Sequence, residues 1–280
     1  MKLPRHGSPG TLCLLSYNIL EGLQPDDSAP FDRRQVDRER LQAAQAVVAG
    51  IDPDILVLNE ALYCRQFAGK AVDYGQLFGF PYQASALYDE AWGNTILSRH
   101  PITKSREMRI YNRGGLIATI DTPQGNLSVA SYHPHPGRQP ENKASDFTGL
   151  IDGLTGPLIL CGDMNCISPE DPIDRTQLIL AFRSFSTKAE KAVDQFINSG
   201  VEVFNALSSL GLKDAVPLEG RRYTIPTDLI NLDKSSGMRI DHILSNEAIA
   251  VIGGEVIHNT NTNRASDHHP VMVEFQIRIK

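Results

Sequence analysis

The segment SDHHPV, residues 266–271, places a carboxylate and two imidazoles directly before the alternating run MVEFQIRIK. A carboxylate beside an imidazole can fix the ring and its tautomer, which suits the ring for proton transfer near neutral pH. The same residues also occur in ordinary solvated loops. The other polar residues of the chain decide between these two interpretations.

Polar residues also end several other apolar runs of the sequence. Such positions occur in LLSYN, ILVLNE, LSVASYH and LILCGD, and the residues are Asn18, Asn59, Glu60, His133 and Asp163, with Asn165 two residues beyond Asp163. In addition, MRIDHIL embeds Asp241 and His242 in a predicted strand. A carboxylate at the end of a buried strand is costly unless it is paired, hydrogen-bonded or bound to a metal. Each residue alone fits a cap or a turn, but the whole set predicts a functional site.

The ligand types in this set favour a hard cation. Asn18, Glu60, Asp163 and Asn165 offer oxygen atoms, which suit Mg²⁺ or Mn²⁺ better than Zn²⁺. The H-x-H of HPHP, residues 133–136, is a possible start of a zinc site. Because no histidine or cysteine follows until Cys161, zinc is not favoured.

Composition restricts the class of protein. The chain has 280 residues, of which 41% are hydrophobic and 21% charged, as in soluble globular proteins. A net charge of −6 argues against holding nucleic acid by charge alone, although a bound cation can supply local positive charge. The sequence has no signal peptide and no apolar run long enough to span a membrane, so we expect a cytoplasmic protein. The four cysteines form no CxxC pair and are expected to be reduced and buried.

The pattern of elements predicts an α/β (α+β) fold. The chain opens as strand, helix and strand, and TPQG joins GLIATID to NLSVASYH as a hairpin. The stretch 174–210 is predicted to be two helices that break near NSG, residues 198–200. Hairpins together with crossovers indicate two mixed sheets packed together with helices outside. We expect a flexible tail over residues 1–11 and one domain over residues 12–280.

Seven segments in order carry a resemblance to a known family: SYN, LNEA, GNTILSRHPI, SYHPHP, GDMN, RIDHIL and SDHHPV. The chain resembles the endonuclease/exonuclease/phosphatase superfamily, with its DNase I-like fold, from about residue 12 to residue 276. The resemblance implies a four-layer sandwich of two mixed sheets flanked by helices. It also implies a phosphoester hydrolase that uses Mg²⁺, with Mn²⁺ as a substitute.

The resemblance also implies roles for individual residues. The metal would be held by Glu60, with Asn18 and Asp267 beside it. Asp163 and Asn165 would orient the attacking water and a phosphate oxygen. His268 would act as a base or polarise the phosphate, with its tautomer held by Asp241, and His133 would contact the phosphate or the leaving group. Substrate contacts are predicted for Asn94, His135 and Arg138, whereas His269 is expected to face solvent.

Two departures from the family pattern bear on the substrate. Leu20 stands where abasic-site endonucleases have an acidic residue, with Glu21 as a candidate substitute, and the WCDR signature of inositol 5-phosphatases is missing. The favoured function is a phosphodiesterase for nucleic acid or nucleotides. The alternatives are a phosphomonoesterase or a phospholipid or sphingomyelin head-group hydrolase, and more remotely a non-catalytic binding module. Candidates for a positive rim are Arg99, Arg113, Arg138, Lys143, Arg221 and Arg222. The sequence indicates no protein partner.

Overall fold

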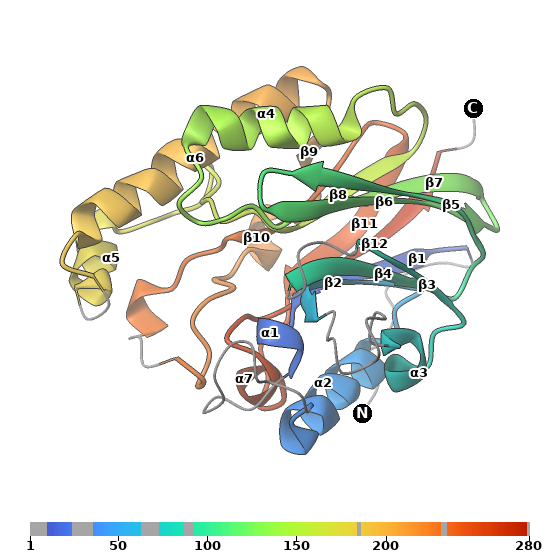
Figure 1. Ribbon diagram of the computed structural model, residues 1–280, viewed down its shortest axis with the longest axis horizontal. Coiled ribbons are helices and arrows are strands. Elements are labelled where there is room, and N and C mark those ends of the chain that lie inside the picture. Colours follow the sequence, from blue (N-terminus) through green and yellow to red (C-terminus); the bar gives the residue numbers. More distant parts are fainter. Residues whose placement is uncertain are drawn as a thin grey trace.

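The computed structural model describes residues 10–23, 36–62, 73–86, 92–183, 186–230 and 234–278. Within these residues, two six-stranded mixed sheets stack face to face, with helices on both outer sides (Figure 1). The expected four-layer α/β sandwich is therefore confirmed. The predicted tail lies mostly outside the described residues, and the division into tail and domain stays a prediction.

The first sheet has the strand order β11-β12-β1-β2-β4-β3. Its strands are β1 (Leu12–Asn18), β2 (Ile55–Leu62), β3 (Tyr82–Ser85), β4 (Trp92–Ser98), β11 (Ile249–Val256) and β12 (Val271–Ile277). β1 runs parallel to β2, because the connection through helix α2 crosses over one face of the sheet, and antiparallel to β12. The helices on the outer side of this sheet are α1 (Leu20–Leu23), α2 (Arg38–Ile51), α3 (Tyr74–Phe78) and α7 (Thr262–Ala265) (Figure 1).

The second sheet has the order β5-β6-β7-β8-β10-β9. Its strands are β5 (Ile102–Ile110), β6 (Arg113–Thr122), β7 (Gly125–Ser131), β8 (Leu158–Asp163), β9 (Lys213–Asp214) and β10 (Asp241–Ser245). Helices α4 (Pro140–Ile151) and α6 (Ala189–Ser209) cover its outer face, and α5 (Arg175–Phe182) packs at one end of α6 (Figure 1). Two short 3₁₀ helices, Leu218–Gly220 and Lys234–Ser236, lie in the connections.

The alternation of side chains along the central strands explains both the core and the position of the site. Odd and even residues of one strand point to opposite faces of the sheet. One set packs in the layer between the sheets, which includes Leu14, Val57 and Cys161. The other set packs against the outer helices, as Leu15 and Leu58 do against α2. Both faces of these strands are covered, which is why they are continuously apolar.

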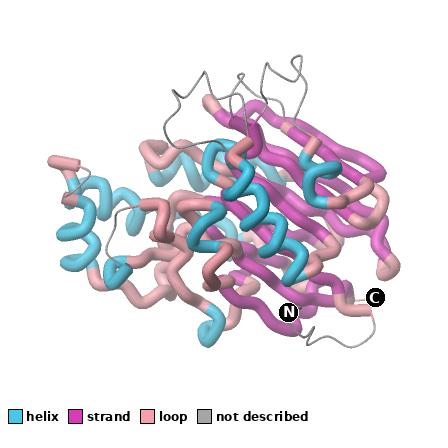
Figure 2. Tube along the Cα trace, turned by 90° about the horizontal axis from the view of Figure 1, so that it is seen from below, coloured by secondary structure: helices cyan, strands magenta, loops and turns pink. Residues whose placement is uncertain are grey.

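The tube in Figure 2 shows the strands running side by side beneath the helices. The hairpin predicted at TPQG is β6–β7, in which Thr122 pairs with Gly125. Strands β3, β5, β9 and β11 were not predicted. β5 is an edge strand whose Lys104, Arg106 and Glu107 are exposed, so it lacks the apolar pattern of a buried strand.

The predicted break at NSG is wrong. The stretch does form two helices, but they separate between Phe182 and Ala189, and Ser199 and Gly200 lie inside α6. A Cβ on Gly200 would lie 1.7 Å from the carbonyl oxygen of Ile167. The glycine therefore lets α6 pack directly against the loop that follows β8, and it does not end the helix.

Three of the four cysteines, Cys13, Cys161 and Cys166, are free and buried, as expected, and Cys64 lies outside the described residues. Among the helices of the described ranges, none has the length and apolar content needed to cross a bilayer. The cytoplasmic location stays a prediction.

Candidate active site

The polar residues that end the central strands meet at one end of the layer between the sheets. Asn18 pairs with Asn59 across β1 and β2, and Asp163 pairs with Asp241 across β8 and β10. Each of these four residues follows the alternation that points it between the sheets, and each is at most 2% exposed. Strand geometry therefore brings together side chains that are far apart in the sequence.

Glu60 enters the site through an irregularity in β2. By alternation it would point to the α2 side, but the pairing of β2 with β4 shifts register between Asn59 and Ala61, and Glu60 has a φ of 55°. A non-glycine residue in this left-handed region is strained, and such strain often occurs at functional sites. The carboxylate accepts a hydrogen bond from the Glu21 backbone N–H at 2.8 Å. Glu21 thus contacts Glu60 through its backbone.

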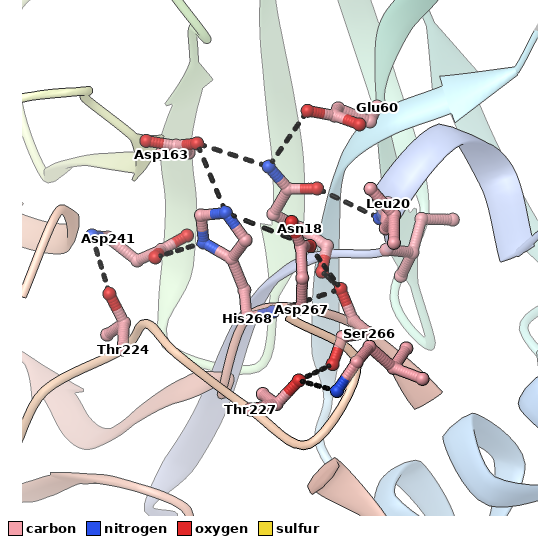
Figure 3. Close-up of polar contacts among 12 residues, drawn as sticks. Asn18, Leu20, Glu60, Asp163, Thr224, Thr227, Asp241, Ser266, Asp267 and His268 are labelled. Carbon is pink, nitrogen blue, oxygen red and sulfur yellow. Dashed lines mark hydrogen bonds and ion pairs between the residues drawn. The ribbon is translucent and has the colours of Figure 1, made fainter. Parts of the chain in front are cut away.

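Asn18 lies between the two carboxylates of the site (Figure 3). Its Nδ2 donates to Oε1 of Glu60 at 3.3 Å and to Oδ2 of Asp163 at 3.1 Å. Its Oδ1 accepts from the Leu20 N–H at 3.0 Å, and its carbonyl oxygen accepts from Ser266 Oγ at 2.7 Å. Asn18 therefore couples β1, β2, β8 and the SDHHPV segment in one network.

His268 is held between two aspartates (Figure 3). Its Nδ1 lies 2.7 Å from Oδ2 of Asp241, and its Nε2 lies 3.7 Å from Oδ2 of Asp163. The Asp241 N–H donates to Thr224 Oγ1 at 3.3 Å, which anchors the backbone of the residue that holds the imidazole. One carboxylate thus orients the ring while its other nitrogen faces the centre of the site.

Asp267 lies at the edge of the same cluster. Its Oδ1 accepts from Ser266 Oγ at 3.3 Å and lies 3.9 Å from Nε2 of His268. Its side chain is 19% exposed, compared with 3% for Asp163. Asp267 is therefore the carboxylate in this group that solvent reaches most easily.

His133 faces the carboxylates from the β7 side. Its Nε2 lies 3.3 Å from Oδ2 of Asp163 and 4.0 Å from Oε1 of Glu60. The neighbouring Tyr132 points to the opposite face, where its hydroxyl contacts Asp146 at 3.2 Å and its ring packs on Phe147.

Asn165 is positioned by the loop that follows β8. Its backbone N–H donates to Oδ1 of Asp163 at 2.9 Å, and its Nδ2 donates to the Pro134 carbonyl at 3.0 Å. Its carbonyl oxygen accepts from Nζ of Lys143 at 2.7 Å. Lys143 is fully buried, so this candidate for a positive rim instead supports the site loop from α4.

Three residues predicted to contact substrate have different positions. His135 lines the site pocket. Asn94 is buried, accepting from Asn59 Nδ2 at 2.6 Å and donating to the Gly114 carbonyl at 2.5 Å, so it joins the two sheets behind the site. Arg138 is held by two hydrogen bonds to Asp146, at 2.7 and 2.8 Å, and does not line the pocket.

The expectation that His269 faces solvent is wrong. The residue is buried, with 1% of its surface exposed. Its ring stacks on His258 with centroids 3.9 Å apart, and its Nδ1 lies 2.9 Å from Thr262 Oγ1. His269 therefore packs into the protein, whereas the neighbouring His268 faces the site.

The sequence indicated only a general role for two residues that the structure brings into this region: Asn59 was one of the polar residues that end strands, and Arg113 was a candidate for a positive rim. Asn59 accepts from the Asp163 N–H at 2.9 Å and contacts Ser131 Oγ at 3.2 Å, so it ties β2 to the opposite sheet. Its position beside Glu60 in an apolar strand was the available signal. Arg113, at the start of β6, lines the pocket together with the catalytic candidates. The amino-acid sequence had indicated only an arginine at the surface.

These side chains line a pocket of about 440 Å³. On one side the lining is polar and is made up of Glu60, Arg113, His133, His135, Asp163, Asn165 and His268. A volume of this size accommodates a small-molecule substrate or one nucleotide unit.

Burial and mutual repulsion shift the protonation of the buried acids. Burial raises the pKa of Glu60 to about 7, and the nearby charge of Asp267 adds to the shift. Burial also raises the pKa of Asp163 to about 7, with a further contribution from Asp241. The site therefore disfavours its own negative charge unless a positive charge is close.

The pKa values of the two histidines of the site shift in opposite directions. Burial holds the pKa of His133 well below its ordinary range, so His133 is neutral. Burial would also lower the pKa of His268, but the carboxylates of Asp241 and Asp267 outweigh it and hold this pKa well above its ordinary value. His268 is therefore the cationic imidazole of the pair.

The residues present fit a divalent cation. Ligand atoms of Asp163, Asp241 and His268 lie within 4.8 Å of one another. Because a cationic His268 has no lone pair to offer, the two carboxylates are the members of this group that would bind the ion. The raised pKa values of Glu60 and Asp163 mark the two buried carboxylates whose charge a cation would stabilise. Because Asn18 turns its amide nitrogen to both carboxylates, its side chain must rotate before its oxygen can act as a ligand.

The raised pKa of Glu60 predicts a pH-dependent stability of the metal-free protein. A folded-state pKa of about 7 exceeds the ordinary 4.5, so the contribution of Glu60 is fully present below about pH 4.5 and is lost as the pH rises through 7. We therefore expect Glu60→Gln to gain stability relative to the wild type between pH 5 and pH 8, by up to a few kcal/mol. Denaturant unfolding in chelator at both pH values measures this difference.

At pH 8, added Mg²⁺ should raise the melting temperature of the wild type and leave that of Glu60→Gln unchanged, because only a folded site binds the ion. Equal responses of the two proteins to pH and to Mg²⁺ would contradict both the titration and the ligand role of Glu60.

Comparison with known proteins agrees with this geometry. The model of the endonuclease/exonuclease/phosphatase family matches residues 15–268. The chain belongs to this family. No curated protein sequence gives a significant match.

Solved structures of the family have the same fold at low sequence identity. An endonuclease/exonuclease/phosphatase from Beutenbergia cavernae is 19% identical with a TM-score of 0.69, covering 95% of this chain and 72% of that one. A 3′ phosphatase from Neisseria, bound to a product DNA hairpin, is 20% identical with a TM-score of 0.64, covering 95% and 99%. TDP2 from D. rerio, in complex with a single-strand DNA product, is 14% identical with a TM-score of 0.61, covering 95% and 99%.

Proposed function

We propose that this protein is a phosphoester hydrolase that uses Mg²⁺, with Mn²⁺ as a substitute, and acts on a phosphodiester of the nucleic acid or nucleotide type. The observation that carries the proposal is the meeting of Glu60, Asp163 and His268 around one pocket. These three residues come from separate strands and loops. Asn18 donates to Glu60 at 3.3 Å and to Asp163 at 3.1 Å, and Nε2 of His268 lies 3.7 Å from Oδ2 of Asp163.

The contacts of the site, together with the pKa shifts of Asp163, His133 and His268, support the following roles. Asp163, with Asn165 fixed beside it, holds the attacking water and accepts its proton. His268 is cationic and donates from Nε2 to a phosphate oxygen, and Asp241 on Nδ1 keeps the ring in that orientation. Neutral His133 donates a hydrogen bond to a phosphate or leaving-group oxygen. Glu60, with Asn18 and Asp267 beside it, would hold the cation, which would supply positive charge to stabilise the negative charge of the phosphate and of the leaving oxygen.

The printed descriptions of two related structures support a nucleic acid substrate. The Neisseria protein is a 3′ phosphatase with a product DNA hairpin, and the D. rerio protein holds a single-strand DNA product. The net charge of −6 and the pocket of about 440 Å³ favour a nucleotide or a short single strand over a long duplex.

A phosphomonoesterase or a phospholipid or sphingomyelin head-group hydrolase is the second candidate, because the same residues would serve those esters. A non-catalytic binding module is disfavoured, since every residue of the proposed machinery is present and in contact with another member of it.

A substrate panel tests the proposal. The protein is incubated with Mg²⁺, with Mn²⁺ and with chelator, against single-stranded and duplex DNA, RNA, dinucleotides, sphingomyelin and sugar phosphates. We expect cation-dependent cleavage of a diester without release of inorganic phosphate. Release of inorganic phosphate from a monoester, or cleavage of sphingomyelin and not of the nucleic acids and dinucleotides, would favour the second candidate. Hydrolysis of no ester would contradict the proposal.

Arg113 and Arg138 provide a matched comparison of substrate contacts. Because Arg113 lines the pocket and Arg138 is bound by Asp146, Arg113→Ala should raise KM by about tenfold or more and Arg138→Ala should leave it nearly unchanged. Steady-state kinetics on the preferred diester measure both. A larger effect at Arg138 would restore its predicted substrate contact and remove that of Arg113.

A further inference from the structure

The pocket that the catalytic groups line also has an apolar part. We call this surface the apolar wall and define it by its lining residues, Phe182, Phe196, Ile225, Ile230, Met238 and Ile240. Among the described lining residues, all the charged and imidazole groups lie outside this set. The pocket is therefore two-sided, with one side suited to a phosphate and the other to an apolar group.

The hydrolysis of a phosphoester does not by itself require an apolar surface. Phe182, Phe196 and Ile225 are only half-buried, so part of their apolar area is left uncovered within the pocket. Exposed apolar surface beside convergent polar groups is typical of a ligand site. The apolar wall thus corresponds to the part of the substrate next to the phosphate.

The apolar wall is attached firmly to the catalytic groups. Ile225 and Met238 exchange two backbone hydrogen bonds, at 2.9 and 3.1 Å. Ile240 directly precedes Asp241, which holds His268. A group bound on the wall is therefore at a set position relative to the imidazole that faces the phosphate.

The aromatic members of the wall indicate what it binds. Phe182 from α5 and Phe196 from α6 meet edge to face, with centroids 5.9 Å apart and planes at 65°. Such a pair presents both a ring face and a ring edge, the two surfaces that a third aromatic ring contacts best. Flexible alkyl groups gain nothing from this geometry beyond burial.

We propose that the apolar wall binds a flat aromatic ring carried by the substrate next to the scissile phosphate. This inference rests on the proposed function and specifies its substrate class as phosphoesters with an adjacent ring, either a nucleobase or an aryl group. Stacking on phenylalanine is tolerant of base identity, so the wall confers preference for a ring and not for a sequence.

Binding of phosphonates, which are not hydrolysed, tests the wall apart from catalysis. With Mg²⁺ present, calorimetry compares methylphosphonate, hexylphosphonate and phenylphosphonate. We expect phenylphosphonate to bind roughly tenfold more tightly than methylphosphonate and more tightly than hexylphosphonate. A second comparison tests a nucleobase: the affinity for thymidine 5′-monophosphate is measured against that for deoxyribose 5-phosphate, in chelator. The pair in which the ring increases affinity more, phenyl or nucleobase, identifies the source of the ring.

Variants of the wall make the test specific. Phe182→Ala and Phe196→Ala should lose most of the preference for phenylphosphonate and retain the affinity for methylphosphonate. Leu180→Ala, on the same helix α5 but 49% exposed and outside the pocket, is the matched control and should behave like the wild type. Phe196→Leu keeps an apolar side chain without a ring, so it should also lose the preference even if Phe196→Ala does not fold.

Three outcomes would overturn the inference: equal affinities for phenyl- and methylphosphonate, tighter binding of hexylphosphonate, or an unchanged preference in the folded phenylalanine variants. The experiments distinguish a failure of the inference about the apolar wall from a failure of the proposed function. A ring preference without hydrolysis of any ester would support the wall and contradict the enzyme, whereas cation-dependent hydrolysis without a ring preference would contradict only the wall.

Discussion

Replacement of Glu60 by glutamine is expected to reduce hydrolysis by about 10³-fold or more while the protein stays folded. Glu60 is 8% exposed, its strand is distorted to place it, and its carboxylate contacts Asn18 and the Glu21 amide. Glutamine has nearly the same shape and keeps one oxygen, so packing is preserved while the negative charge is removed. That charge is what binds a hard cation.

The measurement is kcat/KM at saturating Mg²⁺ on the preferred diester, with melting temperature as the test of folding. Glu219→Gln, an exposed change in the 3₁₀ helix Leu218–Gly220, is the matched control and should keep full activity. Wild-type turnover by folded Glu60→Gln would remove Glu60 from the site.

Replacement of His268 by alanine should abolish nearly all hydrolysis, and Asp241→Asn should reduce kcat by about 10²- to 10⁴-fold. Asp241 lies 2.7 Å from Nδ1 of His268 and helps to hold the pKa of His268 well above its ordinary value. Asparagine keeps the size of the side chain but not the charge. The imidazole therefore loses the charge that fixes its orientation, and its pKa falls.

The pH profile separates this role from a structural one. If cationic His268 donates to the phosphate, wild-type activity falls as pH rises through the raised pKa of His268, and in Asp241→Asn the fall moves to lower pH. Asp121→Asn, an exposed change in β6, is the control and should leave the profile unchanged. An Asp241→Asn profile that coincides with that of the wild type would show that Asp241 does not set the protonation of His268.

Much of the candidate site could be predicted because strand periodicity is local. Asn18, Asp163 and Asp241 each end an apolar strand on the alternation that faces the inner layer, so their direction follows from counting residues. The break in the helical stretch was misplaced for a similar reason, since a glycine in the sequence does not reveal whether it ends a helix or admits a neighbour such as Ile167.

Other features depend on contacts between distant segments. Arg138 and Arg113 are both arginines near predicted strand ends, but only the fold pairs Arg138 with Asp146 and turns Arg113 to the pocket. His269 follows His268 directly, and its burial depends on His258 and Thr262 packing around it. The apolar wall combines residues of α5, α6 and the segment before β10, which no local pattern connects.

The sequence by itself determined the fold class, the family and which polar residues end the inner strands, because side-chain alternation and ordered motifs are properties of short segments. Only the tertiary structure decided that Glu60 turns inward at a bulge, that Nε2 of His268 lies near Asp163, and that an apolar wall lines the same pocket. Distances and the burial that shifts each pKa depend on the packing of whole layers, which a single segment does not specify.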